Sequence, residues 1–413
     1  MERVKQLASQ LTGSKGLAAL ERKNPDDVVV TMAIRSPLCK ARKGGFKDVK
    51  SDELMTEMFR KAVEHSKVDP ALIGDICVGT VLSPSSCYEA RTASLAAGIP
   101  ESVPVQTVNR FCSSGLMAVT IISNQIRAGQ IDIGLAIGVD SMSANPDNGA
   151  PNFSEEIMSC QAANDATKPM GWTSENVADD FKLSREEMDE FAAMSFQRAE
   201  AAQKAGYFDK EIVPFDVPSK DPATGARTKV RVAKDDGIRY GTTKETLLKV
   251  KGAFPQWPPS HTTGGNASQI TDGAAAVMLM SRRKAEELNL PILAKHISTS
   301  VAGLAPRIMG IGPTYAIPMV LERAGITKED VDLYEINEAF ASMYVYCVRN
   351  LGLDINKVNV NGGAIALGHP LGCTGARQVA TGLNELHRRQ GKVLVTSMCI
   401  GTGMGAAAVW VRE

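Results

Sequence analysis

The sequence predicts an α/β protein with a mainly parallel sheet, built as two similar halves with a long insertion in the first half. Segments typical of buried strands alternate with amphipathic segments typical of helices. The order of these segments repeats at an offset of about 260 residues, since Gly115 aligns with Gly375 and Val119 with Val379. From residue 272 onward the offset falls to about 132, which places about 129 extra residues in the first half.

In the first half, short runs of β-branched and aliphatic residues predict buried strands, and longer amphipathic runs predict helices between them. "DDVVVTMAI" at 26–34 is the first expected strand, and "DELMTEMFRKAVEHS" at 52–66 is the first long helix. Three further strands are expected in "ICVGTVL" (76–82), "VPVQTV" (103–108) and "IDIGLAIGV" (131–139).

The second half repeats this order. Helices are predicted in "GPTYAIPMVLERAG" (312–325), in "NEAFASMYVYCVRN" (337–350) and from Pro370 onward. Strands are predicted in "VDLYEI" (331–336), "KVNVN" (357–361) and "KVLVTSM" (392–398).

The insertion differs in character from both halves. It holds Pro-, Asn- and Gly-rich stretches, a charged run "GARTKVRVAKDDGIR", and a helix whose start is marked by Ser184 and Glu187, spaced as a capping box. We interpret it as a cap-like third domain. The predicted division is a leader at 1–25, a first half at 26–139 plus 272–291, an inserted domain at 140–271 and a second half at 292–413.

Composition narrows the class of protein. Lys plus Arg and Asp plus Glu both number 46, so the chain has no net charge that would attract nucleic acid or a membrane surface. Hydrophobic residues make up 44% of the chain but are too scattered for a membrane span. The eight cysteines form no Cys-x-x-Cys pair and no zinc-site spacing, which favours reduced thiols in an intracellular compartment.

The first residues fit an N-terminal peroxisomal address. Arg3 and Val4 are followed, after five residues, by Gln10 and Leu11. The alternative is a frayed leading helix, because Val4, Leu7, Ala8 and Leu11 share one helical face. The C-terminal "VRE" carries no Ser-Lys-Leu-type address.

Cys112, in "NRFCSSGLMAV", lies where a predicted strand gives way to a predicted helix. The partial positive charge at a helix N-terminus favours a thiolate, so we expect a reactive thiol with a lowered pKa. The alternative is a cysteine packed at a strand–helix junction.

His369 lies in the glycine-rich stretch "NVNGGAIALGHPLGCTGAR", just before Pro370. The duplication places it almost where Cys112 stands in the first half, so a pseudo-twofold axis would bring the two together. A thiolate beside a histidine is the arrangement that nucleophilic catalysis requires. A hydrogen-bonded loop histidine is the alternative; a dinucleotide-binding loop is excluded because no G-x-G-x-x-G follows the strand.

Two further segments place polar groups at strand ends. Cys399 precedes Gly401, and glycines let backbone N–H groups approach a ligand. We interpret Cys399 as an acid/base group, with a buried core thiol as the alternative. Asn337 could hold a water or donate to an oxyanion, and its alternative role is a helix N-cap.

Taken together, these stretches resemble the thiolase family, in particular its peroxisomal 3-ketoacyl-CoA branch. The resemblance rests on "NRFCSSGLMAV", "GGNASQITDGAAAV", "EINEAFA", "GGAIALGHPLGCTGAR" and "SMCIGTGMG", with support from "MGWTSENVA" and "DDGIRYGTT". It implies the thiolase fold, a duplicated five-layer αβαβα arrangement with an inserted loop domain. It also implies thiolytic cleavage of 3-ketoacyl-CoA by CoA, the last step of fatty acid beta-oxidation.

The resemblance assigns roles to single residues. Cys112 resembles the acylated nucleophile, and His369 resembles its activator, whose ring also faces the thioester oxygen. Asn337 resembles the residue that holds the water of that oxyanion site. Cys399 resembles the acid/base that protonates the leaving enolate and deprotonates incoming CoA, while the N–H groups of Cys112 and Gly401 would form a second oxyanion hole.

The resemblance also implies ligands and partners. Ser268, and Arg227 in the charged run, are the expected contacts to CoA, which is a co-substrate rather than a permanently bound cofactor. No metal, nucleic acid or membrane span is expected. A homodimer in the peroxisomal matrix is expected, with an import receptor as the partner of the leader.

Two segments, 80–92 and 254–264, depart from the family pattern, as does Phe111, where Gln is commoner. They leave acyl-chain preference and the dimer-facing surface open. A ketoacyl synthase is the nearest enzyme alternative, but such enzymes lack the second cysteine. A non-catalytic thiolase-like lipid- or CoA-binding protein is the alternative from another class.

Overall fold

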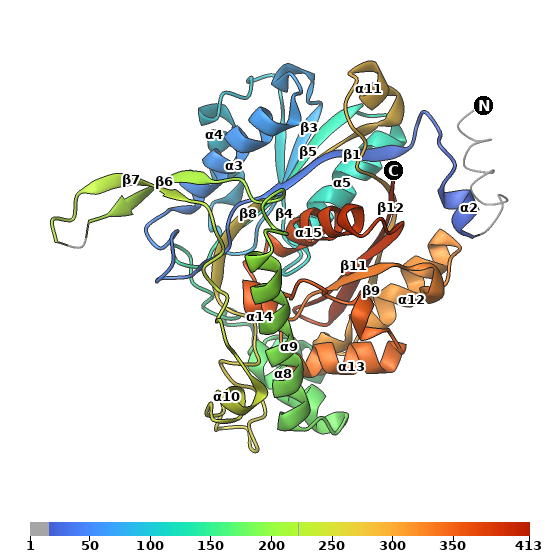
Figure 1. Cartoon of the computed structure of the whole chain (residues 1–413). Helices are drawn as coiled ribbons and strands as arrows, with labels where there is room; N and C mark the ends of the chain where they lie inside the picture. The colour runs from blue at the N-terminus through green and yellow to red at the C-terminus, as the bar shows by residue number, and fades with distance from the viewer. Residues whose placement is uncertain (1–15, 222) are drawn as a thin grey trace.

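The computed structural model describes residues 16–221 and 223–413 (Figure 1). The address predicted from Arg3, Val4, Gln10 and Leu11 lies outside the described residues. Within them, strands and helices alternate through both halves, and the segment between β5 and β8 forms the insertion.

The first half contributes strands in the order β1 (Val28–Arg35), β8 (Thr271–Ser281), β5 (Ile133–Ser141), β3 (Asp75–Gly79) and β4 (Val105–Val108). β8 runs antiparallel to both of its neighbours, whereas β5, β3 and β4 are parallel. The short β2 (Cys39–Lys40) also pairs with β8. β4 is the edge strand of this half, since it pairs only with β3.

The second half repeats this arrangement with β9 (Ala294–Gly303), β12 (Met404–Arg412), β11 (Val393–Ile400) and β10 (Leu333–Ile336). β12 is antiparallel to β9 and β11, and β10 is parallel to β11. β1 meets β9 at Val29 and Val30, which joins the two halves into one continuous sheet. The sheet is therefore mixed rather than mainly parallel. The loop between Ile400 and Met404 is too short to cross over to a parallel strand, so β11 and β12 pair antiparallel.

The prediction of a strand at 357–361 is wrong. This segment makes only a single parallel bridge, between Val358 and Tyr334. Asn359 has a positive φ of 44°. Its side chain accepts from the Ile336 N–H at 2.8 Å and donates to the Ile336 carbonyl at 2.7 Å. These two bonds satisfy the backbone N–H and carbonyl of Ile336 at the end of β10, which a neighbouring strand would otherwise do.

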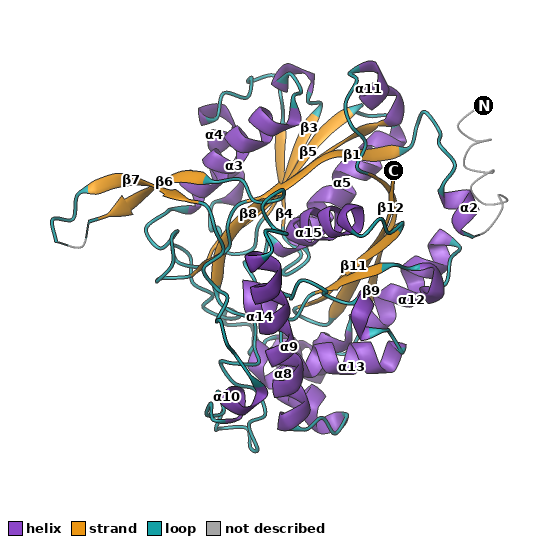
Figure 2. Cartoon of the chain, viewed as in Figure 1, coloured by secondary structure: helices purple, strands orange, loops and turns teal. Residues whose placement is uncertain are grey.

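Helices cover the sheet on both faces (Figure 2). α3 (Ser51–Ser66) and α4 (Ser86–Ala96) cover the outer face of the first half, and α12 (Pro313–Ala324) and α13 (Ala341–Leu351) lie outside the second. Between the halves lie α5 (Ser114–Ala128) and α15 (Thr374–Arg388), which contact each other. The order is helix, strand, helix, strand, helix, which is the predicted five-layer arrangement.

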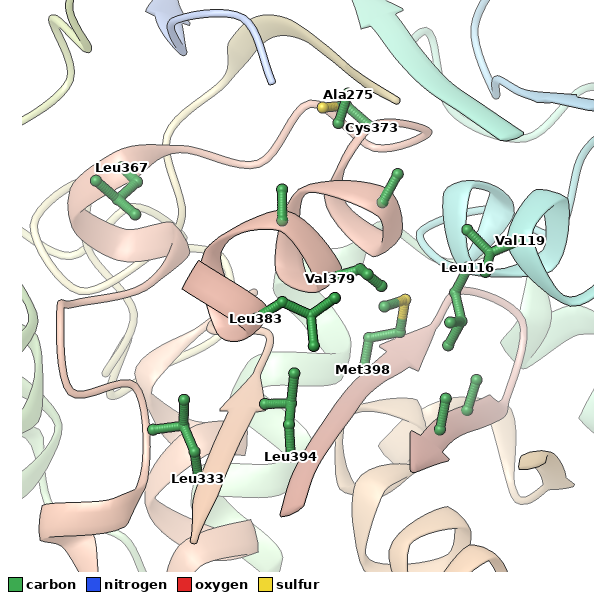
Figure 3. Close-up of a cluster of buried hydrophobic side chains, with 14 of the residues drawn as sticks. Leu116, Val119, Ala275, Leu333, Leu367, Cys373, Val379, Leu383, Leu394 and Met398 are labelled. Carbon is green, nitrogen blue, oxygen red and sulfur yellow. The ribbon is translucent and has the colours of Figure 1, made fainter. Parts of the chain in front are cut away.

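The main apolar cores of the described residues follow from these layers. Alternate residues of β5 face opposite sides of the sheet, so Leu135 packs with the outer helices and Ala136 with the central pair. The central core joins side chains of α5, α15, β10 and β11, including Leu116, Val379, Leu394 and Met398 (Figure 3). Because both halves bury residues in this one core, the ends of α5 and α15 are held in a single rigid unit.

Helices are the main regular elements of the insertion, although most of its described residues lie in loops. Its elements are α6 (Glu155–Ser159), α7 (Gln161–Ala166), α8 (Met170–Asp180), α9 (Arg185–Lys204), α10 (Lys244–Leu248) and the hairpin β6 (Phe215–Lys220) and β7 (Arg227–Val232). The predicted capping box of α9 is confirmed, with Ser184 Oγ accepting from the Glu187 N–H at 3.2 Å. α8 and α9 pack against α13, and α9 also packs against α14 (Ala364–Leu367). The hairpin projects away from the body (Figure 1). The predicted domain boundaries remain a prediction.

Short elements complete the described chain: α2 (Leu17–Leu20), α11 (Arg282–Glu287), and the 3₁₀ segments Pro70–Leu72, Pro306–Ile311, Lys328–Asp330 and Ile355–Lys357.

A buried ion-pair cluster ties the insertion to both halves. Arg35, at the end of β1, lies 2.6 Å from Glu211 and 2.7 Å from Asp235, and its side chain is fully buried. Thr381 of α15 donates to Glu211 at 2.9 Å. Breaking a buried pair leaves an uncompensated charge, so these contacts hold the insertion in one position against the strand ends.

Candidate active site

Cys112 lies in a tight turn between β4 and α5, two residues before the helix begins. The Ser114 N–H and hydroxyl donate to the Phe111 carbonyl at 2.9 and 2.7 Å. Phe111 has a positive φ of 46°, which turns the chain sharply before the cysteine. Cys112 is buried, with only 8% of its surface exposed.

The expectation that the pKa of Cys112 is lowered is wrong. Burial raises the pKa of its thiol to about 11, while hydrogen bonds from the backbone N–H groups of Gly401 and of Cys112 itself act in the opposite direction. The loss of hydration therefore raises the pKa of Cys112 by more than the partial positive charge at the N-terminus of α5 lowers it. At neutral pH the free protein holds a thiol that must lose its proton during the reaction.

His369 is buried and its ring is held at both nitrogens. Its Nδ1 lies 2.6 Å from Thr374 Oγ1, and that hydroxyl lies 3.2 Å from the Pro370 carbonyl. The carbonyl can only accept, so the hydroxyl donates to it and accepts from Nδ1–H, which leaves Nε2 with its lone pair. Burial, followed by the charge of Arg377, lowers the pKa of His369 to about 3, so the ring is neutral.

Asn337 contacts the second ring nitrogen of His369, Nε2. Its Nδ2 lies 3.3 Å from His369 Nε2, and its backbone N–H donates to the Ser397 carbonyl of β11. The N-cap alternative is wrong, because α13 begins only at Ala341 and Phe340 occupies the N-cap. The Asn337 Oδ1 atom is buried and accepts no hydrogen bond from the described residues, so it is available to a water or a substrate group.

Cys399 is the second thiol of the cluster. It is the penultimate residue of β11 and is 1% exposed. Burial, then the nearby Cys112, raises its pKa well above the usual value. Its Sγ lies 3.7 Å from Met343 Sδ, within a small apolar group that also contains Met309 and Ala339. Cys399 is thus both a buried thiol and a neighbour of the candidate nucleophile.

The two residues expected to contact CoA lie in different places. Ser268 is half-buried, and its N–H donates to the Ala339 carbonyl at 3.0 Å. The next residue, Gln269, accepts from the His369 N–H at 3.0 Å, so Ser268 borders the cluster. Arg227 lies on the projecting hairpin, 3.0 Å from Glu53. Its contact with CoA remains a prediction.

Two supporting residues were missed from the sequence. Thr374 orients His369; the signal was a hydroxyl at the start of the helix that follows the histidine. Asp140, at the end of β5, accepts from the Gly372 N–H at 2.6 Å and from Thr80 Oγ1 at 2.9 Å. It joins the histidine loop of the second half to the β3 loop of the first, a contact between segments that no local pattern connects.

The arrangement suits acyl transfer. It combines two thiols, a neutral imidazole and a backbone N–H aimed at the nucleophilic sulfur. Among residues 16–221 and 223–413, no three His, Cys, Asp or Glu side chains converge as a metal site would require. In the same part of the chain, no helix has the length and apolar character needed to cross a bilayer.

The chain is similar to known proteins along most of its length. The N-terminal domain of the thiolase family matches residues 28–283, and the C-terminal domain matches residues 290–412. The chain is 52% identical over 418 residues to a peroxisomal 3-ketoacyl-CoA thiolase of Yarrowia lipolytica, with 100% of both chains covered.

Two solved structures are also similar. The dimeric peroxisomal thiolase of Saccharomyces cerevisiae has a TM-score of 0.89 and 47% identity, covering 96% of this chain and 100% of its own. Human mitochondrial 3-ketoacyl-CoA thiolase in complex with CoA has a TM-score of 0.83 and 37% identity, covering 94% of this chain and 98% of its own. With both family domains matched in order along the duplicated fold, the chain belongs to the thiolase family.

Proposed function

We propose that this protein is a 3-ketoacyl-CoA thiolase of peroxisomal beta-oxidation. It would cleave a 3-ketoacyl-CoA with CoA, giving acetyl-CoA and an acyl-CoA shortened by two carbons. One observation carries the proposal: Cys112, with the Gly401 N–H at its sulfur, lies beside a second buried thiol, Cys399. A nucleophile and a separate acid/base group are what the two half-reactions require.

In the first half-reaction, Cys112 Sγ attacks the 3-keto carbon while its proton passes to His369 Nε2. The neutral ring, with Nδ1–H donated to Thr374, presents Nε2 as the acceptor for this proton. The bond between C2 and C3 then breaks, and its electron pair leaves on the acetyl-CoA enolate. The Cys399 thiol protonates that enolate at C2, which releases acetyl-CoA and leaves an acyl-cysteine.

In the second half-reaction, the Cys399 thiolate takes the proton of incoming CoA. The CoA sulfur attacks the acyl carbon, the bond to Cys112 breaks, and the thiolate of Cys112 recovers its proton from His369. The raised pKa of Cys399 makes its thiolate a strong base for this step. Atoms and charge balance without any further cofactor.

Each half-reaction places negative charge on an oxygen. The N–H groups of Gly401 and Cys112, which point to the Cys112 sulfur, would donate to the oxygen of the acyl group attached there. His369 and the Oδ1 atom of Asn337, which has no hydrogen-bond partner among the described residues, would form the second oxyanion site. A water held by Asn337 would complete this site for the enolate oxygen. Preorganised donors of this kind lower the barrier because they need no rearrangement during the reaction.

The assembly and location follow from the relatives. We propose a homodimer, since the similar yeast structure is dimeric. The edge strand β4 is half-buried and Tyr88 is 80% exposed near it, which supports this face as the contact. We further propose a peroxisomal location, CoA as the co-substrate and an import receptor for the leader; relatives named peroxisomal and the human complex with CoA support these proposals.

One assay tests the proposal. The protein is incubated with acetoacetyl-CoA and CoA, and acetyl-CoA formation is followed. Turnover that disappears in Cys112→Ala supports the proposal. No acetyl-CoA from any 3-ketoacyl-CoA would instead favour a non-catalytic protein that binds lipid or CoA.

A further inference from the structure

Phe111, the residue before the nucleophile, presents an aromatic ring at the site although its backbone is strained. Its φ of 46° is unusual for a bulky side chain, and its side chain is 41% exposed. Three hydrogen bonds maintain this conformation. The Phe111 N–H donates to Asn109 Oδ1 at 3.0 Å, and the Phe111 carbonyl accepts two bonds from Ser114. Strain retained in this way is typical of functional sites.

The ring lies directly beside Gly401. A Cβ atom built on Gly401 would lie 3.6 Å from Cγ and Cδ1 of the Phe111 ring and 3.8 Å from Met170 Sδ. Gly401 also directs its N–H to the Cys112 sulfur. An acyl group on Cys112 with its oxygen at this N–H therefore has Phe111 and Met170 as the next apolar surfaces.

We propose that Phe111 and Met170 form the surface on which the alkyl chain of the substrate's acyl group packs, and so set the preference for longer chains. This inference rests on the proposed thiolase activity. The ring and the thioether are apolar, and a methionine adapts to chains of different shape.

The insertion fixes the position of Met170. Met170 is the first residue of α8, and the Phe254 ring packs tightly on the following Gly171, leaving no room for a Cβ atom. Glu175 of the same helix accepts from the N–H groups of His261 and Thr262, both at 2.8 Å. The segment 254–264, which departs from the family pattern, thus supports the Met170 side of the proposed acyl surface. Its unusual sequence would therefore bear on substrate preference.

Phe111→Ala tests this inference, because alanine keeps the Cβ atom and the backbone conformation but removes the ring. We measure kcat/KM with acetoacetyl-CoA and with 3-ketododecanoyl-CoA. The value for the long substrate should fall about tenfold relative to the value for acetoacetyl-CoA, the lower end for lost apolar contact in a pocket. Phe111→Leu should recover most of the loss. Tyr315→Ala is the matched control, since Tyr315 is a 47% exposed aromatic on α12.

Two results would overturn the inference. An equal fall for both substrates would show that the ring positions Cys112 rather than the chain, and unchanged kinetics for both would show that the chain packs elsewhere. Sedimentation of Phe111→Ala identifies a further contrary result, in which the ring is a dimer contact and the variant dissociates. If the wild-type protein cleaves neither substrate, the proposed function fails and this inference fails with it.

Discussion

Gly115 of α5 and Gly375 of α15, which align in the two halves of the sequence, meet in the central layer of the structure. A Cβ atom on Gly115 would lie 2.6 Å from the Gly372 carbonyl and 2.9 Å from the Ala376 nitrogen. One on Gly375 would overlap the backbone of Leu116. The helix that begins after Cys112 therefore crosses the helix that begins after His369 at backbone contact, and this crossing brings the two residues to one site.

Gly115→Ala should destabilise the protein, because the added methyl group overlaps backbone that cannot move independently. We expect a loss of about 1–3 kcal/mol in the free energy of unfolding, measured by urea denaturation. Gly303→Ala is the control, since a Cβ there meets nothing within 4 Å. Equal stability of the two variants would contradict the close crossing.

Replacing the two cysteines should have different effects. Cys112→Ala should abolish the acyl-enzyme, because no sulfur remains to carry the acyl group. Cys399→Ala should lower thiolysis roughly 10²–10⁴-fold, the usual contribution of a general acid-base group, yet still permit slow acylation of Cys112 from acetyl-CoA. Intact-protein mass and steady-state rates distinguish them. Near-normal turnover of Cys399→Ala would leave Cys399 as a packing residue only.

Thr374→Val should impair catalysis without removing any reacting group. The hydroxyl that holds Nδ1–H of His369 is lost, so the ring no longer presents Nε2 in a fixed tautomer. We expect kcat to fall roughly tenfold to a hundredfold, less than for the loss of a charged orienting group. Thr374→Ser, which keeps the hydroxyl, should restore most of the rate. Failure of serine to restore it, at unchanged thermal stability, would rule out the orienting role.

The fold should lose stability as pH rises above about 9. Burial is the main cause of raised pKa values in six thiols: Cys39, Cys77, Cys112, Cys347, Cys373 and Cys399. Between the ordinary thiol pKa and these raised values, the unfolded chain ionises while the folded chain keeps its protons. Folding then binds protons, so the free energy of unfolding falls with pH, by up to about 1.4 kcal/mol per unit for each thiol.

Urea unfolding from about pH 8 to pH 10.5, with a reductant present, measures this slope. Cys77→Ala should reduce the slope by about one thiol's share. Stability that stays level across this range would contradict the raised pKa values.

The leader should direct a carrier protein to peroxisomes. Residues 1–20 are fused to a fluorescent reporter, and the same fusion with Arg3→Ala serves as the control. The matched positions Arg3, Val4, Gln10 and Leu11 predict a punctate signal for the first and a diffuse signal for the second. A diffuse signal for both would show that these residues are no address.

The sequence alone determined most of the order of elements, the duplication and the candidate nucleophile, base and second thiol. Periodicity is a local property, so β1, α3 and the capping box at Ser184 were predictable without tertiary information. The alignment of Gly115 with Gly375 needed only the chain itself, and it pointed to Cys112 and His369 as partners across a pseudo-twofold axis.

Tertiary structure decided what depends on surroundings. A thiol's pKa reflects the water removed by every neighbouring element, so the helix terminus beside Cys112 could not predict the rise to about 11. The turn after His369 places Thr374 at its Nδ1 atom. Two other contacts join segments that are distant in sequence: the Asn359 side chain bonds the end of β10, and the ring of Phe111 lies beside Gly401. Such contacts arise only once the two halves and the insertion have packed, because that packing fixes which groups lose water and which meet.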